Sequence, residues 1–225
     1  MFDVVQREET AEIVCFGGGA GAELVAAAAA VKALLPRPDP RADAPPPQEI
    51  TGRLHMTGVD IANWGEAFEQ LHGGIKESFL PGDIFSADFV RADVLAADLA
   101  ELVPRGTRLI SMLFTTNELY TQSRAATTKM LLGLAGLVDK GCLLIVLESA
   151  GSYSMVKVGE KTFSMGMLLD HTLVGEEWEK IVEHEARWYR LPQAQTVNGQ
   201  MVGAGLRYPL GLENMRYFVR VFRRL

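Results

Sequence analysis

The fold of this chain is decided by residues 12–24, which read EIVCFGGGAGAEL. The apolar run at residues 13–16 predicts a buried strand, the glycines of residues 17–21 predict a tight turn, and the alanine-rich run at residues 22–35 predicts a helix. Glycine suits such a turn because it accepts positive φ and has no Cβ to hold a ligand away. Strand, glycine turn and helix in this order indicate a nucleotide-type cofactor site in an open α/β sheet.

Length and composition fit one domain that spans residues 1–225. With 225 residues, of which 48% are hydrophobic, the chain can bury one substantial core. It has no apolar run of the roughly 18–20 residues that a membrane helix needs, and residues 1–10 do not resemble a signal peptide. We therefore expect an intracellular protein with no membrane partner. Cys15 and Cys142 both lie in apolar runs, and two cysteines predict neither a zinc cluster nor a disulfide framework.

The net charge of −6 is distributed unevenly along the chain. Residues 1–100 contain 7 Lys and Arg against 16 Asp and Glu, whereas residues 101–225 contain 15 against 12. One interpretation is solvated helix faces. The other is an acidic half that suits a cationic ligand and a basic half that can meet an anion. The acidic total argues against a protein that coats nucleic acid in general.

Strands alternate with helices along most of the chain, which predicts a mostly parallel sheet with right-handed crossovers. After the first strand and helix, we expect strands at residues 52–61, 85–92, 109–114 and 142–147, and helices at 64–72, 96–103, 121–138, 163–173 and 176–188. Two closing strands, 188–191 and 215–224, predict a hairpin with one antiparallel strand. Six of the ten prolines fall in residues 36–47, so we interpret residues 36–49 as a loop insertion within the domain. The expected fold class is α/β and Rossmann-like.

Two cofactor classes compete for the glycine turn. Gly17-x-Gly19-x-x-Ala22 can be fitted to the dinucleotide fingerprint, whereas Gly17-x-Gly19-x-Gly21 fits a loop that binds S-adenosylmethionine (SAM). Glu23 lies in the first helical turn, where a dinucleotide would place its pyrophosphate. A carboxylate there repels an anion but suits a ligand that carries an ammonium and a sulfonium group, which favours SAM.

Acidic residues follow the next two expected strands. Asp60 ends the strand at 52–61 and Asp93 follows the strand at 85–92, so both should lie at the ligand edge of the sheet. Asp60 can accept hydrogen bonds from both ribose hydroxyls, and Asp93 can hold the adenine amino group. The closing hairpin is expected of class I methyltransferases and not of NAD-binding domains. The alternative is that both residues are ordinary turn or helix-capping aspartates.

The loop at residues 114–120 is the expected acceptor site, because it follows the fourth strand and is rich in hydrogen-bonding groups. We expect Glu118 to accept the proton that methyl transfer releases and Asn117 to orient the substrate. Alternatively, Thr116, Asn117 and Glu118 only form a helix N-terminus with a cap and a first-turn acid. In the loop at 148–154, Tyr153 could stack on a base or close over the cofactor, or be an ordinary loop aromatic.

Other chemistries are not favoured. The histidines, His55, His72, His171 and His184, show no metal-ligand spacing, so we expect no metal. The chain has no Gly-x-Ser-x-Gly elbow and no Walker lysine, which argues against hydrolases and NTPases.

Five stretches together resemble the fungal SAM-dependent methyltransferases of the 25S ribosomal RNA uracil-N3 type. They are FGGGAGAE (16–23), VDIANW (59–64), LFTTNEL (113–119), GSYS (151–154) and LENMRY (212–217). The resemblance covers nearly the whole chain, and it implies a class I methyltransferase with a seven-stranded sheet. It further implies that the acceptor is ribosomal RNA at uracil N3, and that the protein acts in the nucleus, nucleolus or cytoplasm.

The expected site follows from the residues and this resemblance together. SAM, with S-adenosylhomocysteine (SAH) as product, should bind at Phe16, Gly17, Gly18, Gly19, Gly21, Glu23, Asp60, Ile61, Asp93, Val94, Phe114 and Thr115. The expected catalytic residues are Asn117, Glu118 and Tyr120, and the expected substrate contacts are Thr116, Ser152 and Tyr153. A small-molecule acceptor and a non-catalytic binding or assembly module on the same fold are the alternatives, and an NAD-dependent oxidoreductase is a more distant one.

Overall fold

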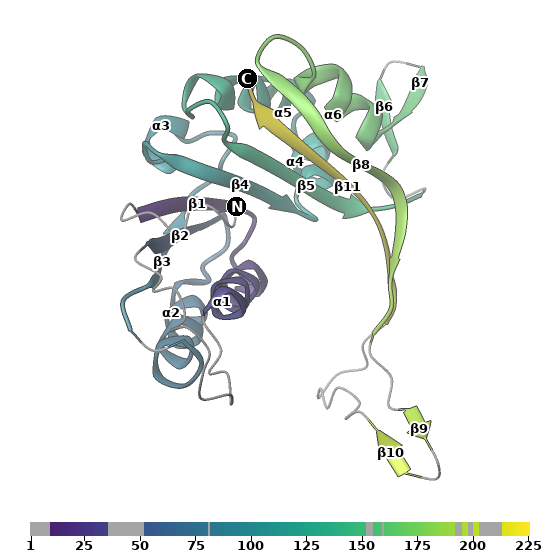
Figure 1. Ribbon diagram of the computed structural model, residues 1–225. Coiled ribbons are helices and arrows are strands. Elements are labelled where there is room, and N and C mark those ends of the chain that lie inside the picture. The colour runs from purple at the N-terminus through teal and green to yellow at the C-terminus, as the bar shows by residue number, and fades with distance from the viewer. Residues whose placement is uncertain are drawn as a thin grey trace.

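A computed structural model describes residues 10–35, 52–80, 82–151, 155–158, 160–191, 195–197, 200–202 and 213–225 (Figure 1). The expected proline-rich insertion, residues 36–49, lies outside these residues. Among the described helices, none is both long and apolar enough to cross a membrane.

A seven-stranded sheet forms the centre of the protein, with the strand order β3-β2-β1-β4-β5-β11-β8. The strands are β1 (Thr10–Phe16), β2 (Arg53–Asp60), β3 (Phe85–Arg91), β4 (Thr107–Leu113), β5 (Leu143–Ser149), β8 (Trp178–Tyr189) and β11 (Met215–Arg224). Neighbouring strands pair in parallel along the series β3, β2, β1, β4 and β5, whereas β11 is antiparallel to both β5 and β8. The expectation of a mostly parallel sheet with an antiparallel C-terminal hairpin is therefore confirmed.

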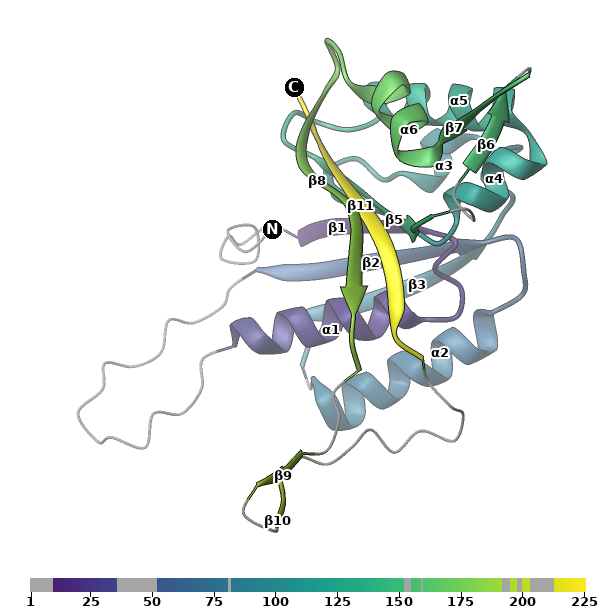
Figure 2. The same cartoon turned by 90° about the vertical axis from the view of Figure 1, so that its right-hand side faces the viewer.

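Helices cover both faces of the sheet (Figure 2). One face carries α1 (Ala22–Leu34) and α2 (Gly65–Gly74), which continues into a π-helical turn (Ile75–Phe79). The other carries α3 (Leu99–Leu102), α4 (Thr116–Gln122), α5 (Arg124–Gly133) with a 3-10 turn (Leu134–Gly136), and α6 (Met165–Leu173). Two small ribbons lie outside the sheet, β6 (Met155–Val158) with β7 (Lys161–Ser164) and β9 (Gln195–Val197) with β10 (Gln200–Val202).

Successive side chains of β1 point to opposite faces of the sheet, so its apolar residues pack in two different cores. Ile13 and Cys15 pack with α1 and α2, whereas Val14 and Phe16 pack in the core below α3–α6. Because both faces of a central parallel strand are buried, the run at residues 13–16 is apolar without interruption. This burial fixes the end of β1, and with it the position of the glycine turn.

The expected helix at residues 176–188 is wrong, because this segment forms the long strand β8. Its acidic residues face the arginines of β11: Arg223 pairs with Glu179 at 2.5 Å and Arg220 contacts Glu183 at 3.5 Å. Glu183 also pairs with Lys180 of the same segment, whereas Glu179 finds its partner, Arg223, on β11. Tertiary pairing therefore overrides the helical appearance of the acidic run.

The expected helix at residues 121–138 is divided. Ser123 has an extended backbone between α4 and α5, and its Oγ accepts a hydrogen bond from the Ala126 nitrogen at 3.3 Å. Ser123 thereby caps a new helix that changes direction. The first part of the segment expected as a helix at 163–173 belongs to β7, and α6 begins at Met165.

Candidate functional site

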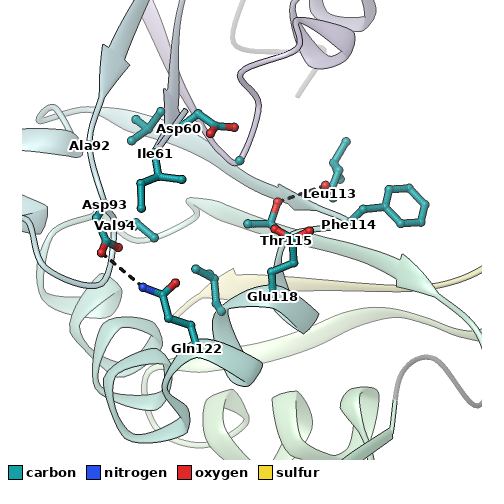
Figure 3. A pocket seen from close by; sticks show the side chains of 13 residues that line it. Asp60, Ile61, Ala92, Asp93, Val94, Leu113, Phe114, Thr115, Glu118 and Gln122 are labelled. Carbon is teal, nitrogen blue, oxygen red and sulfur yellow. Dashed lines mark hydrogen bonds between the residues drawn. The ribbon is translucent and has the colours of Figure 1, made fainter. Parts of the chain in front are cut away.

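A cleft of about 300 Å³ opens where the parallel strands end, a volume typical of small-molecule sites (Figure 3). It is lined by Gly17, Val59, Asp60, Ile61, Ala92, Asp93, Val94, Leu113, Phe114, Thr115, Glu118, Leu119 and Gln122. Asp93 and Gln122 meet at one end of the cleft, and Phe114 and Thr115 lie at the other (Figure 3). The cleft therefore collects residues that follow β1, β2, β3 and β4, as expected for a ligand site in an open α/β sheet.

The glycine turn brings bare backbone against this cleft. Gly17 has φ of 79°, and a Cβ placed on it would lie 2.1 Å from Thr115 Oγ1. A Cβ on Gly19 would lie 2.1 Å from Cδ1 of Trp64 and 2.8 Å from the Asp60 Cβ. At both positions a Cβ would collide, so close packing favours glycine, and at Gly17 the positive φ requires it by conformation as well.

Asp60 joins the glycine turn to the end of β2. Its two carboxylate oxygens accept hydrogen bonds from the Ala62 nitrogen at 2.8 Å and from the Gly19 nitrogen at 3.3 Å. The first bond forms the turn that the alternative interpretation proposed. Asp60 still lines the cleft, so the turn role and a ligand role are compatible.

Asp93 has a comparable arrangement at the end of β3. Its Oδ1 accepts from the Leu95 nitrogen at 2.9 Å, and its Oδ2 lies 3.4 Å from Nε2 of Gln122 (Figure 3). This side-chain contact, at one end of the cleft, connects the loop after β3 with α4.

The cleft is acidic. Its lining residues include the carboxylates of Asp60, Asp93 and Glu118, and among the described residues no Lys, Arg or His lines it. Glu23 lies behind the turn, where burial raises the pKa of its carboxyl. Its own backbone hydrogen bond opposes this rise, and the charge of Asp60 adds to it. Such a field favours a cationic ligand and disfavours a pyrophosphate.

The chain enters α4 through a strained residue. Phe114 has φ of 60°, a left-handed conformation that is costly for a bulky side chain. The conformation is held by a hydrogen bond from the Phe114 nitrogen to the Leu147 oxygen at 2.8 Å. The Thr115 hydroxyl bonds the carbonyl oxygens of Phe16 at 3.1 Å and Leu113 at 3.2 Å. Side chains following Phe114 are thereby fixed relative to β1.

Glu148, near the end of β5, is only 3% exposed and contacts the residues that follow Phe114. Its Oε2 accepts hydrogen bonds from the Thr116 hydroxyl and from the Asn117 nitrogen, both at 3.2 Å. A buried carboxylate requires such donors, and here they come from the first turn of α4. The helix expected to begin at residues 116–118 does begin at Thr116 with Glu118 in its first turn, but its N-cap residue is Thr115, whose side chain makes no capping bond. Glu118 is exposed and lines the cleft.

The remaining expected residues lie around the cleft or behind it. Phe16 and Thr116 are fully buried, and Tyr120 is 5% exposed in the core below α4. Gly18, Gly19, Gly21, Glu23 and Asn117 belong to the adjoining turns but do not line the cleft. Ser152 and Tyr153 lie outside the described residues.

Sequence reasoning missed several residues of the site. Gln122 could have been found, since it follows Glu118 by four positions and shares its helix face. Val59, Ala92, Leu113 and Leu119 line the cleft as apolar residues and carry no sequence signal of their own. Glu148 had one weak signal, an acid at the end of an apolar strand.

The residues of the cleft fit a SAM-type ligand: carboxylates surround it, and bare glycine backbone adjoins it where any Cβ would collide. In the part of the chain that the structure describes, no group of three or more His, Cys, Asp and Glu side chains is arranged to hold a metal ion. The strand order, the antiparallel strand β11 and this cleft define a class I, Rossmann-like methyltransferase fold.

The chain belongs to the family described as "Putative SAM-dependent methyltransferase", whose sequence model matches residues 3–223. It is 34% identical over 233 residues to the 25S rRNA (uridine(2843)-N(3))-methyltransferase of Saccharomyces cerevisiae. The match covers 96% of this chain and 61% of the yeast protein, so the chain spans about three fifths of that relative's length.

Solved structures show the same fold. A SAM-dependent methyltransferase of Methanosarcina mazei superposes with a TM-score of 0.56 at 12% identity, covering 98% of this chain and 95% of the other. The 16S rRNA (adenine(1408)-N(1))-methyltransferase of Catenulisporales acidiphilia superposes with a TM-score of 0.52 at 12% identity, covering 100% and 92%. At these identities the likeness concerns the fold alone.

Proposed function

We propose that this chain is a methyltransferase that uses SAM to methylate N3 of a uracil base in large-subunit ribosomal RNA. The observation that carries the proposal is the 34% identity, over 96% of the chain, to a yeast protein named for this reaction. The acidic cleft supports the cofactor independently, because SAM is cationic and a dinucleotide is not. The substrate also suggests where the protein works, namely in the nucleus, nucleolus or cytoplasm.

The turns around the cleft would hold the cofactor. Asp60 would accept the ribose hydroxyls, Asp93 would accept the adenine amino group, and Gly17 would keep the backbone close to the ligand. Ile61 and Val94, which line the cleft beside the two acids, would provide apolar contacts to the adenine ring. SAM, when bound, supplies an electrophilic methyl group on a sulfonium centre and leaves as SAH.

The first turn of α4 would contact the methyl acceptor and take up its proton. Glu118 is exposed on the cleft wall and would accept the proton that leaves uracil N3 as the N–CH₃ bond forms. Glu148 would keep α4 in place through Thr116 and Asn117. Precise placement matters because a bimolecular transfer gains most from holding the two reacting atoms in line.

The cofactor half of the proposal is tested by calorimetry with SAH. The parent should bind SAH, and Asp60→Ala should weaken binding at least tenfold, since the ribose acceptor is gone. Asp83→Asn is the matched control, because Asp83 is exposed and borders a different depression, at the opposite edge of the sheet. A well-folded parent that does not bind SAH or SAM would overturn the proposal.

The acceptor half is tested by incubating the chain with tritiated SAM and 25S rRNA, followed by nucleoside analysis. Label should appear in N3-methyluridine, and Glu118→Gln should slow its appearance by about a hundredfold, the lower range for general acid–base catalysis, with SAH affinity retained. Label in a small-molecule pool but not in RNA would refute the RNA acceptor while leaving the methyltransferase activity intact.

A further inference from the structure

The ribbon of β8 and β11 continues past the C-terminal end of β5 (Figure 1). Tyr217 pairs with Ser149, the last residue of β5, and the Ala150 nitrogen donates to the Arg216 oxygen at 3.1 Å. The cleft lies at the carboxyl ends of the parallel strands, and the outer part of the ribbon begins at this same end of the sheet. We call residues 187–190 and 215–217 the outer ribbon.

The outer ribbon exposes two large aromatic side chains. Trp188 is 60% exposed and Tyr189 is 51% exposed. Trp188 lies directly opposite Arg216, and Arg187 lies opposite Tyr217. Large aromatic groups are normally withdrawn from water, so each exposed ring is a candidate contact; as consecutive strand residues, Trp188 and Tyr189 lie on opposite faces of the ribbon.

The arginines of the outer ribbon differ from those nearer the sheet. On the inner part of the same ribbon, Arg220 and Arg223 pair with carboxylates of β8, and Arg224 pairs with Glu177 just before it. Arg187, Arg190 and Arg216 are exposed and form no ion pair within the described residues. Arg216 lies with Trp188 on one face of the ribbon and Arg187 lies on the other, so together with Arg190 they place positive charge on both faces of a chain of net charge −6.

Free arginines combined with exposed aromatic rings match the chemistry of single-stranded nucleic acid, which presents phosphates and stackable bases. We propose that the outer ribbon binds a single-stranded RNA segment next to the acceptor base, with Trp188 stacking on a base and the arginines contacting phosphates. The inference rests on the proposed RNA acceptor and assigns it a surface. Arg216 and the buried Phe218 are two residues apart in β11, so their side chains point to the same face of the sheet, the face that carries α4. Trp188 lies opposite Arg216 and therefore shares this face.

The test measures fluorescence anisotropy of a labelled single-stranded oligouridylate at several KCl concentrations. A triple variant, Arg187→Ala with Arg190→Ala and Arg216→Ala, should bind at least tenfold more weakly. Its slope of log affinity against log salt should decrease by about 2, because each phosphate contact on a single strand contributes about 0.7. Trp188→Leu should weaken binding about tenfold, while Trp188→Phe keeps a stacking ring and should stay near the parent.

The charge-matched control is Arg53→Ala with Arg105→Ala and Lys140→Ala, three exposed cations at the opposite edge of the sheet. All variants should bind SAH like the parent, which shows that they are folded. If the parent binds no RNA, the proposed acceptor and the ribbon surface both fail. If the parent binds and methylates RNA but the ribbon variants behave like the control, the ribbon inference alone is overturned. Equal affinities of Trp188→Leu and Trp188→Phe would exclude stacking.

Discussion

Oε2 of Glu148 lies 3.2 Å from the backbone nitrogen of Asn117, so a carboxylate at the end of β5 holds the first turn of α4. The two residues are 31 positions apart in the chain. The hydroxyl of Thr116 donates to the same oxygen at 3.2 Å. The loop that carries the proposed proton acceptor, Glu118, is therefore anchored to the sheet by one buried side chain.

Replacing Glu148 by alanine should destabilise the protein and impair the reaction together. The substitution removes the acceptor of the buried Thr116 hydroxyl and of the part-buried Asn117 and Ser149 nitrogens, and an unsatisfied buried donor costs about 1–3 kcal/mol in the free energy of unfolding. Glu148→Gln keeps one oxygen acceptor in the same volume and should cost less. Urea unfolding and methyl transfer at saturating SAM measure the two effects. An alanine variant as stable as the parent would show that Glu148 does not anchor α4.

The substitution Gly17→Ala should weaken SAH binding in the cleft. The Cβ of Gly17→Ala would meet Thr115 Oγ1 at 2.1 Å, and φ of 79° adds about 1–3 kcal/mol of strain. We expect SAH affinity to fall at least tenfold, measured by calorimetry. Gly73→Ala is the control, because Gly73 lies in α2 with nothing within 4 Å of its Cβ position. That change should raise stability by about 0.5–1 kcal/mol. Equal SAH affinities in the two variants would contradict the requirement for glycine.

Local patterns sufficed to predict the parts of the fold and site that depend on neighbours in the chain. The glycine turn follows a strand that must be buried, and Asp60 and Asp93 come at or just after strand ends, so their meeting at one edge follows from a parallel sheet. The strand β8 could not be predicted in this way. Its acids are paired by arginines of β11, which come some 40 residues later. The role of Glu148 likewise depends on donors that arrive from a distant loop.

Removing Arg220 should weaken the attachment of β8. Its side chain is 1% exposed and contacts Asp170, Glu183 and Glu185. Arg220→Ala should lower the free energy of unfolding by about 3 kcal/mol, the lower limit for a broken buried pair, because the carboxylates can regain water. Arg223→Ala removes a half-exposed arginine from the same strand and should cost no more than about 1 kcal/mol. Urea denaturation compares the two, and similar losses would argue against a buried network at Arg220.

Glu23 should make stability fall as the pH rises from acid to neutral. Burial raises the pKa of its carboxyl above the ordinary 4.5, so the folded state holds this proton more tightly than the unfolded state does. The resulting stabilisation is complete below pH 4.5 and is lost as the pH passes through the raised folded-state pKa. Glu23→Gln should therefore be more stable than the parent at neutral pH, and the advantage should vanish in acid.

Urea unfolding across this pH range measures the Glu23 effect. Glu66→Gln is the matched control, the same substitution at an exposed acid in the first turn of α2. The same Glu23→Gln variant should bind SAM more weakly, because it removes a negative charge from behind the turn that adjoins the proposed cationic ligand. A Glu23→Gln variant with the pH profile of the parent would show that the buried carboxyl does not set it. If Glu23→Gln gains stability at neutral pH and loses SAM affinity, the Glu23 carboxylate contributes to ligand binding while it lowers the stability of the fold.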